Sequence, residues 1–136
     1  MVTDPKALVR SVAEASGYAV QEDGDTWRVT VPIGSLRKQV VDITFDVNDR
    51  EGHSMIRYTS TCGPASEKNA MKLLRYNTKL VHGAFAVVDQ GGGPVVVLQA
   101  NQLAETADPL QVTRLLTSIA WQADKVEEKL LHTDEH

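Results

Sequence analysis

The chain has 136 residues, 42% of them hydrophobic and 24% charged, which is typical of a globular protein and far from the polar, highly charged profile of a disordered chain. Its 14 Lys and Arg against 18 Asp and Glu give a formal net charge of -4, which argues against a nucleic-acid partner because affinity for phosphates rests on clustered Lys and Arg. Residues 1–7 lack the apolar stretch of a signal peptide, and no run of about 20 apolar residues is present, so we expect neither export by that route nor a membrane span.

The first predicted element is a helix. Asp4 can cap free backbone amides and Pro5 suits the first helical position, while Gly17 is a plausible end. The apolar residues between them form an arc wider than one packing surface needs: Leu8, Val9, Val12, Ala13 and Ala15. Two interpretations of this arc stay open, a binding surface or an ordinary core face.

From Tyr18 the apolar pattern changes to a period of two, which predicts half-buried antiparallel strands. The strands cover 27–31, 41–47 and 55–62. Turn-forming residues lie before the first strand at 23–25, between the first and second strands at 32–35, and after the second strand at 48–52. The pattern therefore predicts a three-stranded meander after the first helix.

A second helix and a hairpin follow the meander. Ser66 can cap the helix, whose apolar stripe includes the polar Asn77, and we interpret Asn77 as a buried amide that holds the following turn. Two further strands, 80–88 and 95–100, flank a glycine-rich hairpin loop. Because residues 95–98 are apolar on both faces, we expect both faces to be covered, and this predicts a homodimer.

The last predicted element is a long helix. Asp108 and Pro109 with Gln111 resemble a capping box. Apolar residues then recur at alternating spacings of four and three: Val112, Leu116, Ile119, Ala123, Val126 and Leu130. Trp121 falls about 180° away, on the polar side of the helix. It either takes part in an interface, where buried aromatics dominate binding, or packs within its own chain.

The predicted order α-β-β-β-α-β-β-α over residues 1–136 indicates one α+β domain, a two-layer sandwich with an antiparallel sheet. This layout resembles the class I type III secretion chaperones and the YbjN-type proteins of the Tir chaperone superfamily. Residues 73–77, Leu-Leu-Arg-Tyr-Asn, are similar to the end of the family's second helix, and 83–86 to its next strand. Residues 95–98, Leu103 and 108–130 resemble its last strand, loop and long C-terminal helix with a late tryptophan.

The resemblance implies a non-catalytic, chaperone-like protein that needs no cofactor and binds another polypeptide as a homodimer. Clients in that family are held extended over the first helix and early strands, which implies client-binding residues Leu8, Val9, Val12, Trp27, Val29 and Ile33. Dimerisation through the second helix and the next two strands, with the exposed indole added, gives the interface residues Leu73, Tyr76, Phe85, Val96, Leu98 and Trp121. An extended segment can also add backbone hydrogen bonds at a sheet edge.

Cys62 leaves an alternative open. It is the single cysteine, so no intrachain disulfide forms and a reducing cytoplasm is the expected location. A position just before a helix start would lower its pKa and favour a thiol-dependent enzyme or ligand-binding protein, whereas a buried cysteine ending a strand is the more ordinary interpretation. The acidic residues Asp42, Asp46, Asp49 and Glu51 lack metal-loop spacing, so we expect no metal site. A third hypothesis is a structural or regulatory dimer that contacts a folded protein.

Overall fold

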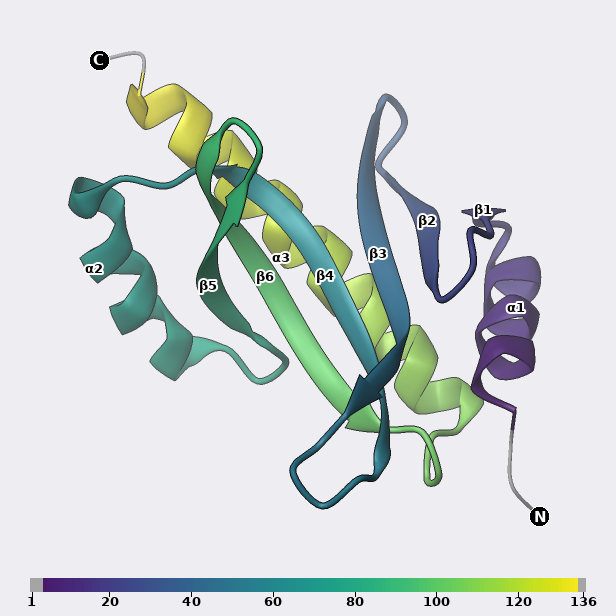
Figure 1. The fold of residues 1–136 in the computed structure, drawn as a ribbon. Coiled ribbons are helices and arrows are strands. Elements are labelled where there is room, and N and C mark those ends of the chain that lie inside the picture. The colour runs from purple at the N-terminus through teal and green to yellow at the C-terminus, as the bar shows by residue number, and fades with distance from the viewer. Residues whose placement is uncertain (1–3, 135–136) are drawn as a thin grey trace.

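The computed structural model describes residues 4–134, with side chains described as far as residue 129. The elements follow one another along the chain as α1 (Pro5–Ser16), β1 (Ala19–Gln21), β2 (Thr26–Ile33), β3 (Arg37–Asn48), β4 (Ser54–Pro64), α2 (Glu67–Tyr76), the 3-10 turn η1 (Asn77–Lys79), β5 (Ala84–Gln90), β6 (Gly93–Leu103) and α3 (Pro109–Asp134). Figure 1 shows α3 running behind the sheet, with α1 beyond one edge and α2 beyond the other.

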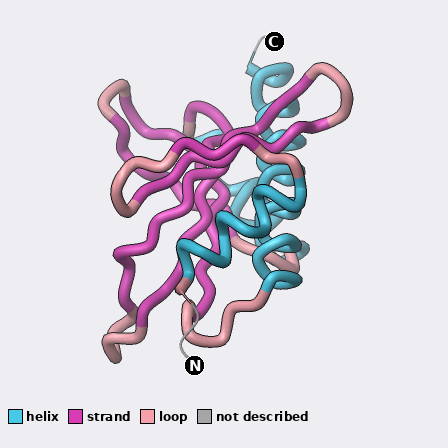
Figure 2. The backbone as a smooth tube through the Cα atoms, turned by 90° about the vertical axis from the view of Figure 1, so that its right-hand side faces the viewer, coloured by secondary structure: helices cyan, strands magenta, loops and turns pink. Residues whose placement is uncertain are grey.

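The sheet is antiparallel throughout, with strand order β1-β2-β3-β4-β6-β5. Seen from the side, most of the sheet lies to one side of the helices, and one strand hairpin reaches over to the helix side at the top (Figure 2). The predicted α+β sandwich is therefore confirmed. The structure adds β1, whose three residues are too few to show an apolar period in the sequence.

Local capping sets the ends of the helices where the sequence predicts them. The Asp4 carboxylate accepts a hydrogen bond from the Lys6 amide at 3.0 Å, and Gly17 ends α1 with φ 75°, in the left-handed region that favours glycine. In α2, Ser66 and Asn69 form a reciprocal capping box. At the start of α3, Asp108 accepts from the Gln111 amide at 2.8 Å.

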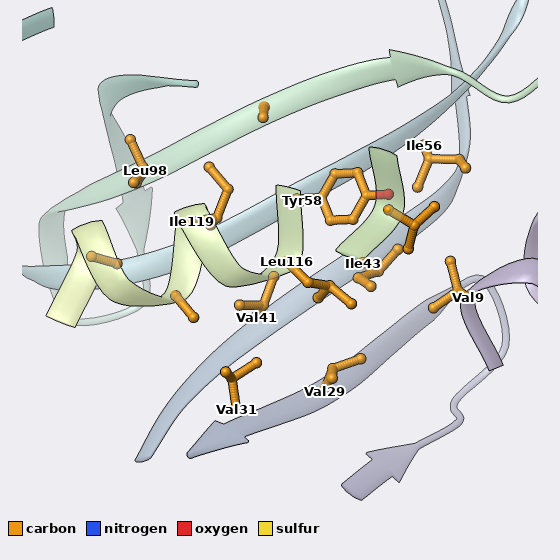
Figure 3. Packing of buried hydrophobic residues seen from close by; sticks show 14 of the residues in the cluster. Val9, Val29, Val31, Val41, Ile43, Ile56, Tyr58, Leu98, Leu116 and Ile119 are labelled. Carbon is orange, nitrogen blue, oxygen red and sulfur yellow. The ribbon is translucent and has the colours of Figure 1, made fainter. Parts of the chain in front are cut away.

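The hydrophobic core lies between α3 and one face of the sheet. The apolar seam of α3 is buried at Val112, Leu116, Ile119, Ala123 and Val126, and Leu130 lies outside the described side chains. In Figure 3, labelled residues of α3 point toward side chains of β3, β4 and β6: Leu116, Ile119, Val41, Ile43, Tyr58 and Leu98. Because strand side chains alternate between faces, the opposite face is polar, with Thr30, Asp42, Thr44, Arg57, Thr59, Gln99 and Asn101.

Part of strand β6, residues 96–98, is covered on both faces, as its sequence predicts. Val96, Val97 and Leu98 have no exposed surface in the single chain, although successive side chains point to opposite faces. The cover therefore comes from the chain itself. The expectation that a second copy of the chain must cover residues 95–98 is therefore wrong, and β6 gives no independent reason for a dimer.

Strands β3 and β4 diverge at one end. Their pairing runs from Asp42 opposite Thr59 to Asn48 opposite Ser54 and does not continue past Asp42. There the buried side chain of Gln39 bridges the strands, donating from Nε2 to Ser60 Oγ at 2.9 Å and to the Thr61 carbonyl oxygen at 3.1 Å. Ser60 Oγ donates in turn to the Val40 carbonyl oxygen at 2.7 Å. Side chains thus satisfy backbone groups that a strand pair would otherwise satisfy.

Candidate protein-interaction site

The six client-binding residues inferred from the resemblance are core residues. Their exposed fractions are Leu8 8%, Val9 0%, Val12 4%, Trp27 2%, Val29 0% and Ile33 7%. Trp27 packs edge to face on Phe45 with ring centroids 4.9 Å apart, and its indole donates to the Gly24 carbonyl oxygen. Helix α1 buries Leu8, Val9, Val12 and Ala13 of its wide arc and leaves only Ala15 exposed, so the expectation of an exposed apolar patch here is corrected.

The six predicted interface residues divide by burial. Phe85, Val96 and Leu98 are buried inside the chain, whereas Leu73 and Tyr76 are half-buried. Trp121 is 50% exposed on α3, as its place on the polar side of the helix predicts. Of this set, Leu73, Tyr76 and Trp121 therefore retain surface for a partner.

Helix α2 and strand β5 present an exposed apolar surface. The sequence-based prediction included neighbouring residues of these elements but not the exposed ones. Met71, Leu74 and Val87 are 55%, 60% and 52% exposed, and we call these three residues the α2–β5 surface. Beside it is a hollow of about 100 Å³ lined by Ala70, Leu73, Leu74, Phe85, Ala86, Val87 and Val96. Met71 and Leu74 are three residues apart and so share a helix face, which is a sequence signal that could have identified them. Val87 has no such signal because its neighbours in the strand are also apolar.

Asn77 holds α2 to the sheet. Its side-chain oxygen accepts from the Phe85 amide at 2.7 Å, and its Nδ2 donates to the Phe85 carbonyl oxygen at 3.3 Å. Tyr76 adds a tilted ring contact with Phe85, with centroids 6.0 Å apart. Asn77 is half-buried and not fully buried as expected, but the interpretation of it as a satisfied amide that holds the following turn is confirmed. These bonds help to set the position of the α2–β5 surface.

Cys62 lies within β4, at an irregularity between Thr61 and Gly63, and is 1% exposed. Helix α2 begins only at Glu67, so the expected position at a helix start is wrong. Burial raises the pKa of the Cys62 thiol to about 12, and the nearby charge of Glu127 adds to the effect. The thiol is therefore protonated at neutral pH and lacks the thiolate that nucleophilic chemistry requires.

An open cavity of about 450 Å³ lies beside this thiol, at the divergence of β3 and β4. Its lining is Arg28, Lys38, Gln39, Val40, Asp42, Thr61, Cys62, Gly63 and Glu127. Arg28 and Asp42 are paired at 3.4 Å. No histidine lines this cavity to act as a base for the thiol.

Asp49 has a structural role in the turn between β3 and β4. Asp49 accepts hydrogen bonds from the backbone amides of Glu51 and His53, and the His53 amide is the main reason that the Asp49 pKa is lowered. In the described part of the chain, no group of three or more His, Cys, Asp or Glu side chains is placed to hold a metal ion. No helix within the described residues has the length and apolar character needed to cross a membrane.

No family model matches the sequence, and no curated protein sequence matches it significantly. Solved structures do match. The type III secretion chaperone SycH of Yersinia pestis, in complex with a stable fragment of YscM2, superposes with a TM-score of 0.60 at 16% identity, covering 90% of this chain and 99% of that chain. YbjN from E. coli superposes with a TM-score of 0.63 at 13% identity, covering 98% and 95%. The class is therefore that of the type III secretion chaperone and YbjN fold, and at these identities the similarity is one of fold.

Proposed function

We propose that this chain is a non-catalytic, chaperone-like protein that binds another polypeptide as a cytoplasmic homodimer. The observation that carries the proposal is the match to SycH over 90% of the chain, because that chaperone was solved holding a fragment of a second protein. The protonated, buried thiol of Cys62 supports a role without nucleophilic catalysis. As a lone cysteine it forms no disulfide within the chain, which fits a reducing compartment.

The proposed homodimer uses the α2–β5 surface. Met71, Leu74 and Val87 are each more than half exposed, and Leu74 and Val87 also line a small hollow. Fully burying one such side chain stabilises by about 1.5–3 kcal/mol, so covering the exposed half of each contributes about 1 kcal/mol. Trp121 offers a further aromatic contact that the single chain leaves uncovered.

Because the six inferred client-binding residues are buried, we propose that a client binds at the neighbouring edge of the sheet. Strand β1 pairs with only three residues of β2, Arg28 to Thr30, which leaves the outer edge of β2 free over 31–33. An extended segment can continue the sheet there through backbone hydrogen bonds. Pro32 has no amide to donate, so this edge offers fewer bonds than a regular strand.

The proposal is tested by co-purification from the native host. The tagged chain is captured beside an unrelated acidic protein of similar size, and bound proteins are identified by mass spectrometry. We expect one or more polypeptides enriched over the control, and each is then rebound in two forms, freshly diluted from urea and fully folded. Preferential capture of the unfolded form supports the chaperone-like function. Absence of any enriched polypeptide contradicts the proposal, and capture of the folded form alone favours a regulatory dimer instead.

A further inference from the structure

A second cavity, of about 340 Å³, lies where the loop before β5 meets the end of β6 and the first turns of α3. Its lining is His82, Gln102, Leu103, Thr106, Gln111, Arg114 and Leu115, and we call it the Arg114 cavity. Three segments of the chain, at residues 82, 102–106 and 111–115, form it. Its volume falls within the range of sites that hold small ligands or single side chains.

A chain of hydrogen bonds orients the polar groups of the Arg114 cavity. The Tyr58 hydroxyl donates to Gln102 Oε1, and Gln102 Nε2 donates to Gln111 Oε1 at 3.3 Å. Burial raises the pKa of Tyr58 above its ordinary value, so the phenol remains a donor. Since the chain of bonds uses the Gln111 acceptor oxygen, the N–H groups of the same amide are left for a ligand.

The charge of the Arg114 cavity is entirely positive. No carboxylate lines it, and among the described residues no carboxylate is paired with Arg114 or His82. The helix neighbours of Arg114 three and four residues away are uncharged: Leu110, Gln111, Thr117 and Ser118. Asp108, an acid near it in sequence, accepts the Gln111 amide as a helix cap. In a chain of net charge -4, this is a local positive site that offers donors.

We propose that the Arg114 cavity binds the carboxylate of an Asp or Glu side chain in a bound polypeptide, with Arg114 and the Gln111 amide as donors. Leu103 and Leu115 give the cavity an apolar wall, so the favoured segment carries apolar residues beside its acid. Guanidinium donors match carboxylates in charge and geometry. This inference rests on the proposed function, since it names the chemistry of the polypeptide that the chain would hold.

The test uses two fluorescent, end-blocked peptides with alternating leucine and glutamate or alternating leucine and glutamine. Binding is measured by fluorescence anisotropy at fixed ionic strength. We expect the glutamate peptide to bind about tenfold more tightly, the size of one charge-assisted hydrogen bond. Arg114→Gln should remove this preference while leaving the glutamine peptide unaffected. Gln111→Glu replaces the donor with an acceptor at an exposed position. It should also remove the preference for the glutamate peptide and leave binding of the glutamine peptide unaffected.

Arg50→Gln is the matched control, because Arg50 is an exposed arginine in the turn between β3 and β4. It removes the same charge and should leave both affinities unchanged. Equal affinity for the two peptides, or equal losses in Arg114→Gln and Arg50→Gln, overturns the inference. Complete displacement of the glutamate peptide by millimolar acetate also overturns it, since the cavity would then be a small-anion site. A native partner that binds Arg114→Gln as well as wild type would refute this inference while leaving the proposed function intact.

Discussion

At the scale of single residues, Cys62 shows how burial decides chemistry. The residue next to a predicted helix start has the sequence context of a reactive thiol, yet it sits in β4 with 1% of its surface exposed. Its thiol makes a weak hydrogen bond to the Ser60 carbonyl oxygen at 3.9 Å. The protein gains packing from this side chain and leaves it uncharged.

This burial predicts a pH-dependent contribution to stability. The pKa of Cys62 is raised from 9.0 to about 12 on folding, so the unfolded thiol ionises first as the pH rises. The contribution is therefore complete below about pH 9 and is lost as the pH rises toward 12. We expect the difference in unfolding free energy between wild type and Cys62→Ala to shrink by about 1 kcal/mol from pH 8 to pH 10.

Urea unfolding of the two proteins at both pH values measures this change. Other groups that ionise over this interval, such as Tyr58, are present in both proteins, so their effect cancels in the difference. A difference that stays constant between pH 8 and pH 10 would show that the thiol is solvated in the folded state.

At the scale of elements, α3 organises the core because its apolar seam meets β2, β3, β4 and β6. The end of the helix is also tied to the sheet: Arg37 at the start of β3 contacts Asp124 at 2.8 Å and Glu128 at 3.1 Å. Asp124 is 8% exposed, so its ion pair with Arg37 is partly shielded from solvent. The helix is thus positioned by apolar packing along its length and by an ion pair near its end.

Two leucines of α3 allow the packing to be tested with one kind of substitution. Leu116 is fully buried, whereas Leu110 is 59% exposed. Leu116→Ala removes core volume and should lower the unfolding free energy by about 3 kcal/mol. Leu110→Ala is the matched control and should change it by less than about 0.5 kcal/mol. Chemical denaturation of both variants measures these changes, provided that the dependence of the unfolding free energy on denaturant concentration is unchanged. Similar losses of unfolding free energy in the two variants would mean that α3 does not lie on the sheet as described.

At the scale of the whole molecule, the surface is divided. The uncovered sheet face is polar and carries pairs such as Arg57 with Asn101, 2.8 Å apart. Several large exposed apolar side chains lie on other elements, among them Met71 and Leu74 on α2, Val87 on β5 and Trp121 on α3. An extended polar face suits solvent, while the α2–β5 surface is the place where burial against a second copy would stabilise most.

We therefore expect the paired substitution Met71→Glu and Leu74→Glu to weaken the proposed homodimer by at least about tenfold in dissociation constant, because two charges would be buried without partners. Sedimentation equilibrium across a concentration series, against a monomer mass of 14.9 kDa, gives the measurement.

Leu36→Glu is the control, since Leu36 is 94% exposed at the tip of the β2–β3 turn. It introduces a charge at an exposed apolar position away from α2 and should leave the association unchanged. A wild-type protein that is monomeric throughout the series contradicts the dimer proposal directly.

The sequence by itself determined the features that depend on neighbouring residues. Asp4, Ser66 and Asp108 set helix starts by accepting hydrogen bonds from amides two or three positions on. Gly17 ends α1 through its left-handed backbone and donates its own amide to carbonyl oxygens of the last turn. Alternation located the longer strands. The resulting element order was enough to predict the fold that this chain shares with SycH and YbjN.

Only the tertiary structure decided which apolar and polar groups remain at the surface. The burial of Leu8 and Trp27, the placing of Cys62 inside β4 and the convergence of Tyr58, Gln102 and Gln111 all depend on contacts between distant segments. Periodicity reports which face of an element is apolar, but it carries no information on what covers that face. Solvent exposure, and with it pKa and the capacity to bind, is fixed only when those distant segments pack together.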